Sequence, residues 1–131
     1  EREMRPYKQV DQLNLPYGIM ITHHSLVMDP GVPLPVSEKV NQYIRIRFPN
    51  ALIISDEIKM RGLVLNHGNS IKAVIRDLKS DMYITHSGNL FFNLSDIISE
   101  SKKIPMHEQE YYIQRILKFK EKLSLFNIDE I

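Results

Sequence analysis

The chain has 131 residues, of which 43% are hydrophobic and 25% charged, a composition typical of one folded domain rather than of a disordered chain. Its 17 Lys and Arg and 16 Asp and Glu give a formal net charge of +1 and are spread along the chain, so no nucleic-acid partner is expected. The absence of cysteine excludes disulfides, thiolate catalysis and sulfur-ligated zinc, and no apolar run approaches the ~20 residues of a membrane span, so no membrane partner is expected.

The first predicted strand covers residues 17–23 (YGIMITH), and the preceding segment 1–12 is compatible with a helix. The strand is mostly apolar rather than alternating, which is typical of a strand buried on both faces of a sheet. After it, the prolines and the glycine of residues 29–35 (DPGVPLP) forbid regular structure. Ser37 then caps a predicted helix whose apolar residues have helical spacing.

The second predicted strand, residues 51–55 (ALIIS), leads directly into Asp56 and is again continuously apolar. The helix expected to follow it begins near Ile71, and its apolar stripe would pack on a sheet. A third strand is predicted at residues 81–85 (DMYIT), and a long closing helix at about residues 108–123.

These strand starts recur about every 30 residues, which is the length of a βα repeat that builds parallel sheet with right-handed crossovers. The spacing predicts one α/β domain over residues 1–131, with three parallel strands and flanking helices. It does not distinguish an open doubly wound sheet from a closed barrel, because both use this unit.

Polar side chains follow all three predicted strands, at the sheet edge where parallel α/β folds gather their functional groups. They are His23 and His24, Asp56 and Glu57, and Thr85 and His86. A carboxylate at a strand end, such as Asp56, is placed rigidly enough to be a nucleophile or a metal ligand. The alternative is that Asp56 caps the next helix or pairs with Lys59 or Arg61.

The adjacent His23 and His24 suggest a metal site at first sight. Neighbouring residues on a strand point to opposite faces and do not chelate together, so one histidine is expected in the site and no metal is expected. His86 is a candidate substrate contact, because its strand feeds the same edge. No glycine-rich phosphate loop is present, so no nucleotide cofactor is implied.

Residues 53–60 (IISDEIKM) resemble the nucleophile segment of the β-N-acetylhexosaminidases of glycoside hydrolase family 3. The same family has a preceding strand that ends in histidine, a loop with Asp-Pro, and a proline followed by a helix-opening serine. Residues 18–23, 29–30 and 35–37 are similar to these features. Further similar segments flank them, at residues 4–10, 47–50 and 79–82.

The resemblance implies that the chain is the C-terminal half of a (β/α)8 TIM-type barrel, with about the last three βα units. It implies that Asp56 is the nucleophile of a retaining enzyme, which forms a covalent glycosyl-enzyme on N-acetylglucosamine glycosides of the peptidoglycan or chitin type. His23 and Met60 would line the sugar pocket, no cofactor would be needed, and the bacterial relatives suggest a cytoplasmic location.

The chain also departs from the family pattern. Glu57 stands where the family has a second aspartate, which is a mild change, and Lys79 and Ser80 replace small residues before the last strand. The acid/base Asp and His and the sugar-binding Lys-His pair of the family lie upstream of residue 1, so the chain is expected to be a piece of something longer and to be inactive alone. The alternative is a non-catalytic half-barrel that pairs through exposed strand edges with another chain or a copy of itself.

Overall fold

The computed structural model describes residues 5–13, 15–68, 70–85 and 90–124, with the side chains of residues 90–94 left aside. Three strands and several helices follow one another along the chain. In order they are α1 (Arg5–Gln12), β1 (Tyr17–Ile21), the short 3-10 helix η2 (Leu34–Val36), α2 (Glu38–Arg47), β2 (Ala51–Ser55), α3 (Arg61–Asn66), α4 (Ile71–Asp77), β3 (Met82–Tyr83), α5 (Leu90–Ser101) and α6 (Met106–Lys122).

The three strands form one parallel sheet in the order β1-β2-β3, so β2 is central. The predicted α/β class with three parallel strands is thereby confirmed. The first strand ends at Ile21, two residues before the predicted His23, and the third strand is shorter than the predicted residues 81–85. Asp81 explains its late start, because the side-chain oxygen Oδ2 of Asp81 accepts the Ile53 N–H at 2.8 Å, where a strand would present a main-chain carbonyl.

The helices that sequence periodicity predicts are present, and two further α-helices accompany them. The short 3-10 helix η2 begins within residues 29–35, where no regular structure was predicted, because a proline fits its first turn. Ser37 caps α2, as predicted, by accepting the Val40 N–H at 3.1 Å, and α4 begins at Ile71 behind a second cap, Ser70. The closing helix α6 matches its predicted bounds to within two residues. The additional helices, α3 and α5, follow the second and third strands.

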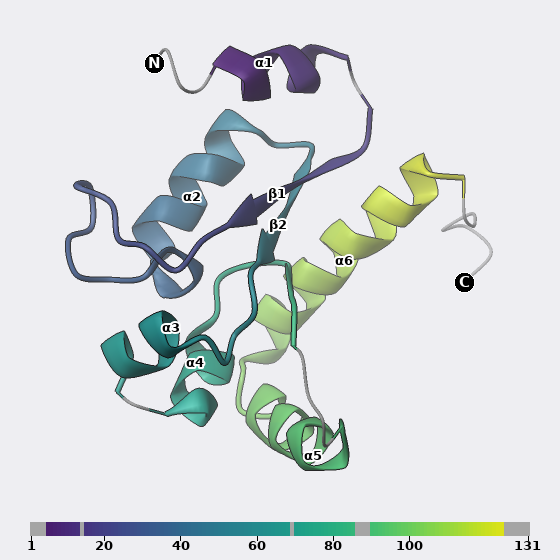
Figure 1. Ribbon diagram of the computed structural model, residues 1–131. Coiled ribbons are helices and arrows are strands. Elements are labelled where there is room, and N and C mark those ends of the chain that lie inside the picture. Colours follow the sequence, from purple (N-terminus) through teal and green to yellow (C-terminus); the bar gives the residue numbers. More distant parts are fainter. Residues whose placement is uncertain (1–4, 14, 69, 86–89, 125–131) are drawn as a thin grey trace.

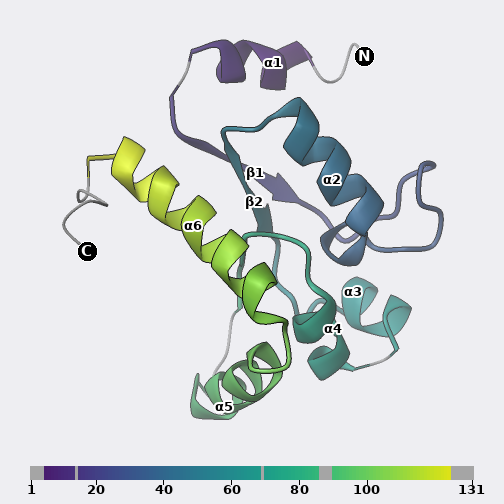
Figure 2. The same cartoon turned by 180° about the vertical axis from the view of Figure 1, so that it is seen from behind.

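The helices surround the strands unevenly. Figure 1 shows α2 and α6 flanking the strands, with α1 at the end where the strands begin and α3, α4 and α5 beyond the end of β2. Figure 2 gives the same order from behind.

Tyr17 ties the first helix to the sheet, because its hydroxyl donates to Asp11 at 2.7 Å. Burial together with that carboxylate raises the pKa of Tyr17.

Two apolar clusters form the core, one between the sheet and its helices and one among the helices beyond it. In the first, Ile19, Ile21 and Ile53 of the sheet pack against Val40, Ile44 and Phe48. The second lies further along, where α3 and α4 pack together, and consists of Val36, Ile58, Leu63, Val74, Ile75 and Leu78. Burial of these side chains, each about 1.5–3 kcal/mol, is the main stabilisation of the fold.

The opposite face of the sheet is covered at its start, where Leu52 is 3% exposed and lines a hollow with Arg115 and Phe119 of α6, and is less covered toward its end. The strand register sets Met20, Ile54 and Met82 side by side on this face, and Ile84 follows two residues beyond Met82. Met20 is 57% exposed, Met82 43% and Ile84 40%. We call these four residues the open face. Soluble proteins rarely expose a contiguous apolar patch, and such patches commonly mark interaction sites.

A buried ionic cluster joins the sheet to both flanking helices. The Asp81 carboxylate is fully buried, and its Oδ1 accepts from Arg45 of α2 and from Arg115 of α6, each at 2.8 Å. Both guanidinium groups also donate to main-chain carbonyls, Arg45 to Lys79 at 2.6 Å and Arg115 to Ala51 at 2.5 Å. We call Asp81, Arg45 and Arg115 the Asp81 cluster.

Removing the carboxylate by Asp81→Ala should lower the free energy of unfolding by about 3–5 kcal/mol, because two arginines are left without their anion in a buried place. Lys72→Ala is the matched control, since it removes the exposed partner of a single ion pair, with Asp96, and should cost less, about 1 kcal/mol. Urea unfolding followed by circular dichroism measures both. Equal losses in the two variants would contradict the central role of the cluster.

Candidate functional site

Main-chain hydrogen bonds hold the segment after β2 on both sides. The Asp56 N–H donates to Ile21 at the end of β1 at 3.2 Å, and the Ile58 N–H donates to Ile84 beyond β3 at 3.0 Å. Ile84 in turn donates to Ser55 at 3.1 Å. Asp56 therefore sits at the carboxyl end of the central strand, in a backbone that both neighbouring strands fix.

The Asp56 carboxylate is partly exposed and makes a local contact. Its Oδ1 accepts the N–H of Glu57 at 2.7 Å, and the Ser55 hydroxyl donates to the Asp56 carbonyl at 2.9 Å. The helix that follows is capped at Met60 without a side-chain hydrogen bond, and among the described residues no ion pair joins Asp56 to Lys59 or Arg61. Asp56 is thus neither a helix cap nor part of a lysine or arginine pair.

The two histidines after β1 have different surroundings, as expected for neighbours on an extended chain. His24 is exposed, and its Nδ1 lies 3.1 Å from the Thr22 hydroxyl. The ring nitrogens of His23 are shielded from solvent, and neither has a hydrogen-bond partner among the described residues. Such unpaired buried groups are rare in folded proteins and cost about 1–3 kcal/mol each, so the unpaired ring of His23 is an unusual feature of this sheet edge.

The other residues predicted to contribute to this edge differ from the histidines in exposure and hydrogen bonding. Met60 is 48% exposed at the start of α3, and its N–H donates to Glu57 at 3.1 Å, which closes the turn after Asp56. His86 lies outside the described residues. Thr85, just before it, has a buried hydroxyl without a partner in the described chain. The structure thus places two unpaired polar groups, on His23 and Thr85, at the same sheet edge as Asp56.

No protein-family model matches the chain, and no curated protein matches it either. Among the described residues, no three or more His, Asp or Glu side chains gather in a way that could hold a metal ion. None of the helices in the same parts of the chain is both long and apolar enough to cross a membrane.

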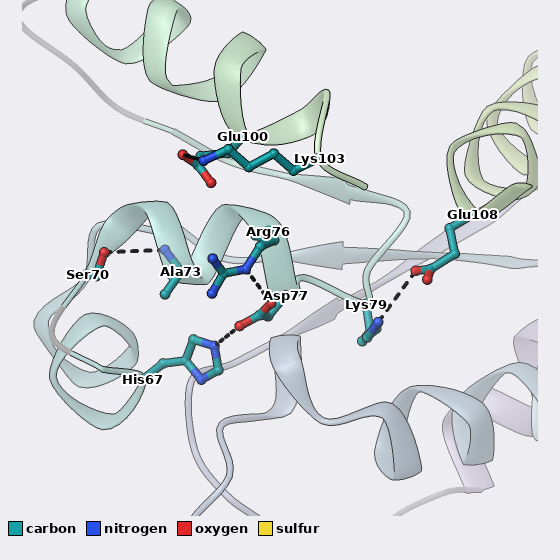
Figure 3. A network of polar contacts seen from close by, with 9 residues as sticks. All are labelled: His67, Ser70, Ala73, Arg76, Asp77, Lys79, Glu100, Lys103 and Glu108. Carbon is teal, nitrogen blue, oxygen red and sulfur yellow. Dashed lines mark hydrogen bonds and ion pairs between the residues drawn. The ribbon is translucent and has the colours of Figure 1, made fainter. Parts of the chain in front are cut away.

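A polar network fixes the segment between the Asp56 turn and α4 (Figure 3). His67, at the end of α3, contacts Asp77 at the end of α4 through Nε2 and Oδ2 at 2.9 Å, and Arg76 contacts the same carboxylate at 3.1 Å. Burial disfavours the charge of Asp77, but hydrogen bonds from Arg76 and His67 outweigh it and lower the pKa of Asp77 below its ordinary value. A hydrogen bond between His67 and Asp77 therefore joins the end of α3 to the end of α4.

The lowered pKa of Asp77 predicts how this contact depends on pH. A depressed folded-state pKa stabilises the fold above the ordinary aspartate pKa of about 4, and this stabilisation is lost as the pH falls through the lower, folded value. Urea unfolding from neutral pH down to strongly acidic pH should show a shallower acid loss in Asp77→Asn than in the unchanged protein. Identical acid limbs would show that the contact does not form in solution.

Proposed function

We propose that this chain is the nucleophile-bearing portion of a retaining β-N-acetylhexosaminidase, with Asp56 as the nucleophile. The observation that carries the proposal is the position of Asp56, partly exposed at the carboxyl end of the central strand: its N–H donates to Ile21 of β1, and the flanking Ser55 and Ile58 are bonded to Ile84 just beyond β3. The substrates would be terminal N-acetylglucosamine glycosides, of the peptidoglycan or chitin type, in the cytoplasm. The resemblance of residues 53–60 to the family's nucleophile segment supplies the reaction.

The chemistry follows from one carboxylate. Asp56 would attack the anomeric carbon and form a covalent glycosyl-enzyme while the leaving group departs, and water would then displace the carboxylate with net retention. His23 would line the sugar pocket, as the resemblance implies. Met60 would supply apolar surface beside it. The protonation of an unactivated leaving group needs an acid. The family carries that acid upstream of the segments that this chain resembles.

The fold proposed for the whole enzyme is a (β/α)8 barrel, of which this chain is the C-terminal half. Two features support this proposal. The open face, with Met20, Ile54 and Met82, has the apolar side chains that fill a barrel interior. The outer edges of β1 and β3 have no strand beside them in the described sheet, and barrel closure would pair both. The implied partner is the N-terminal half of the barrel.

The second candidate function is a non-catalytic half-barrel that binds another chain or a second copy through its strand edges. The open face and the unpaired edge of β1 favour it directly, because both are surfaces that association would bury. The two candidates differ in what they require of Asp56: a nucleophile in the first and only a polar surface residue in the second.

Covalent labelling tests the role of Asp56. The probe is a dinitrophenyl β-glycoside of N-acetylglucosamine that carries fluorine on the sugar ring, because its leaving group needs no protonation and its deglycosylation is slow. Mass spectrometry should show one added sugar on the peptide that contains Asp56. Asp56→Asn should abolish the label, and the matched variant Glu57→Gln should keep it.

Labelling elsewhere, equal labelling of Asp56→Asn, or no labelling at all would overturn the nucleophile assignment and favour the second candidate. Because Asp56→Asn keeps the shape of the side chain, and Oδ1 can still accept the Glu57 N–H, its folding should be unchanged by circular dichroism.

Turnover of an ordinary chromogenic N-acetylglucosaminide tests the absence of an acid/base group. The purified chain should hydrolyse it ~10²- to 10⁴-fold more slowly than an enzyme with a complete pair, because general acid–base catalysis contributes that much. Azide needs no general base to attack a glycosyl-enzyme, so it should speed the reaction of the activated dinitrophenyl substrate and yield a glycosyl azide. Fast hydrolysis of the ordinary substrate would contradict the prediction.

A further inference from the structure

A small hollow of about 100 Å³ lies between the later turns of α6 and the segment that leads into β2 (Figure 1). This volume is smaller than the roughly 300–1,000 Å³ of sites that enclose a whole metabolite, and it suits one compact chemical group. The hollow lies at the start of β2, whereas Asp56 follows the end of the same strand. It is therefore separate from the proposed catalytic position.

Three cationic side chains, and no carboxylate of the described residues, line the hollow. The cations are Arg115, Lys118 and Lys122, all from α6. Lys118 belongs to none of the ion pairs in the described chain, and Lys122 donates to the uncharged amide oxygen of Asn50 at 2.9 Å. Glu121, also in the last turns of α6, is exposed, lies outside the lining and pairs with neither lysine. The hollow thus has positive charge that the described residues leave without a counter-ion.

Arg115 adds donors that are already fixed in place. Its Nε donates to Asp81 and its Nη2 to the Ala51 carbonyl, so one edge of the guanidinium is occupied. The remaining nitrogen, Nη1, has no hydrogen-bond partner among the described residues, and unlike the ring nitrogens of His23 it is not shielded from solvent. Asp81 neutralises Arg115 only in part, because the same carboxylate also serves Arg45. A held guanidinium with free N–H groups is a strong donor to an oxyanion.

The remaining walls of the hollow are largely apolar. Pro49, Leu52 and the half-buried Phe119 contribute to the lining beside the three cations. A concave site that combines charges of one sign with apolar, low-dielectric walls concentrates the electric field, so it attracts counter-ions more strongly than a flat surface with the same charges. The hollow therefore favours a compact anion over a neutral or cationic group.

We propose that the hollow between α6 and the start of β2 binds the phosphate group of a small phosphomonoester, through Lys118, Lys122 and Nη1 of Arg115. Such a group carries a charge of about −1.5 to −2 near neutral pH and three strong acceptor oxygens, which match three cationic donors better than a carboxylate does. Lys122 has three N–H donors, so it can keep Asn50 and also bind the phosphate. The site does not use Asp56.

The test is a titration of the isotopically labelled full chain with methyl phosphate at constant ionic strength, followed by nuclear magnetic resonance. The side-chain amide signal of Asn50 and the main-chain amide signals of residues 118–122 should shift and saturate in the millimolar range. Dimethyl phosphate, which has a single charge and represents the phosphodiesters of nucleic acids, should bind about tenfold more weakly, a difference of about 1.4 kcal/mol. Asp56→Asn should bind methyl phosphate unchanged, which separates this site from the proposed function.

Two lysines of α6 provide the matched pair. Lys118→Gln removes a cation from the lining and should weaken methyl phosphate binding about fivefold, whereas Lys120→Gln removes the same charge outside the lining and should change it less than about twofold. Both side chains are exposed, so both variants should fold. No saturable shift with methyl phosphate, equal weakening in the two variants, or dimethyl phosphate binding as tightly as methyl phosphate would each overturn the proposal.

Discussion

The fold depends on one buried carboxylate. Asp81 brings two arginines from different helices to the start of β3, and its second oxygen takes the main-chain donor of Ile53 in β2. Burying three charges is expensive, and it is tolerated because every member of the Asp81 cluster also bonds main chain. The cluster thereby sets where β3 joins the sheet and attaches α2 and α6 to it. Asp56, three residues beyond Ile53, inherits its position from this arrangement.

Much of this architecture was predictable from local sequence, because local physics decides it. The apolar runs of β1 and β2 have no other stable place than a buried sheet, and Ser37 caps its helix as its chemistry predicts. The stripe that begins at Ile71 gave α4 for the same reason. By contrast, α3 spans six residues and contains Gly62, too short and too weak a helix former to show a period. Helix α5 mixes Asn, Ser and Asp with its apolar residues, which weakens its pattern.

In the candidate site too, some features were predictable from local sequence and others depend on contacts between distant segments. The positions of His23 and Asp56 just after neighbouring strands follow from the apolar runs that precede them, although β1 ends at Ile21, two residues before His23. That both His23 nitrogens are buried and unpaired depends on packing from distant segments, and no spacing encodes it. The Asp81 cluster was missed because Arg45 and Arg115 reach Asp81 over long sequence separations. For the hollow beside α6, a signal was available: Arg115, Lys118 and Lys122 follow one another at spacings of three and four residues, which places them on one side of a helix.

The unpaired edge of β1 has a consequence for the mobility of Asp56. The amide of Asp56 is bonded to Ile21, the last residue of a strand that, within the described sheet, has a neighbour on only one side. Edge strands open locally at lower free energy than central ones, so the Asp56 amide should exchange its hydrogen with solvent whenever β1 separates from β2. Anything that pairs with the free edge of β1 raises the free energy of that opening by mass action. Binding of a partner to the free edge of β1 and the ordering of Asp56 are therefore thermodynamically linked.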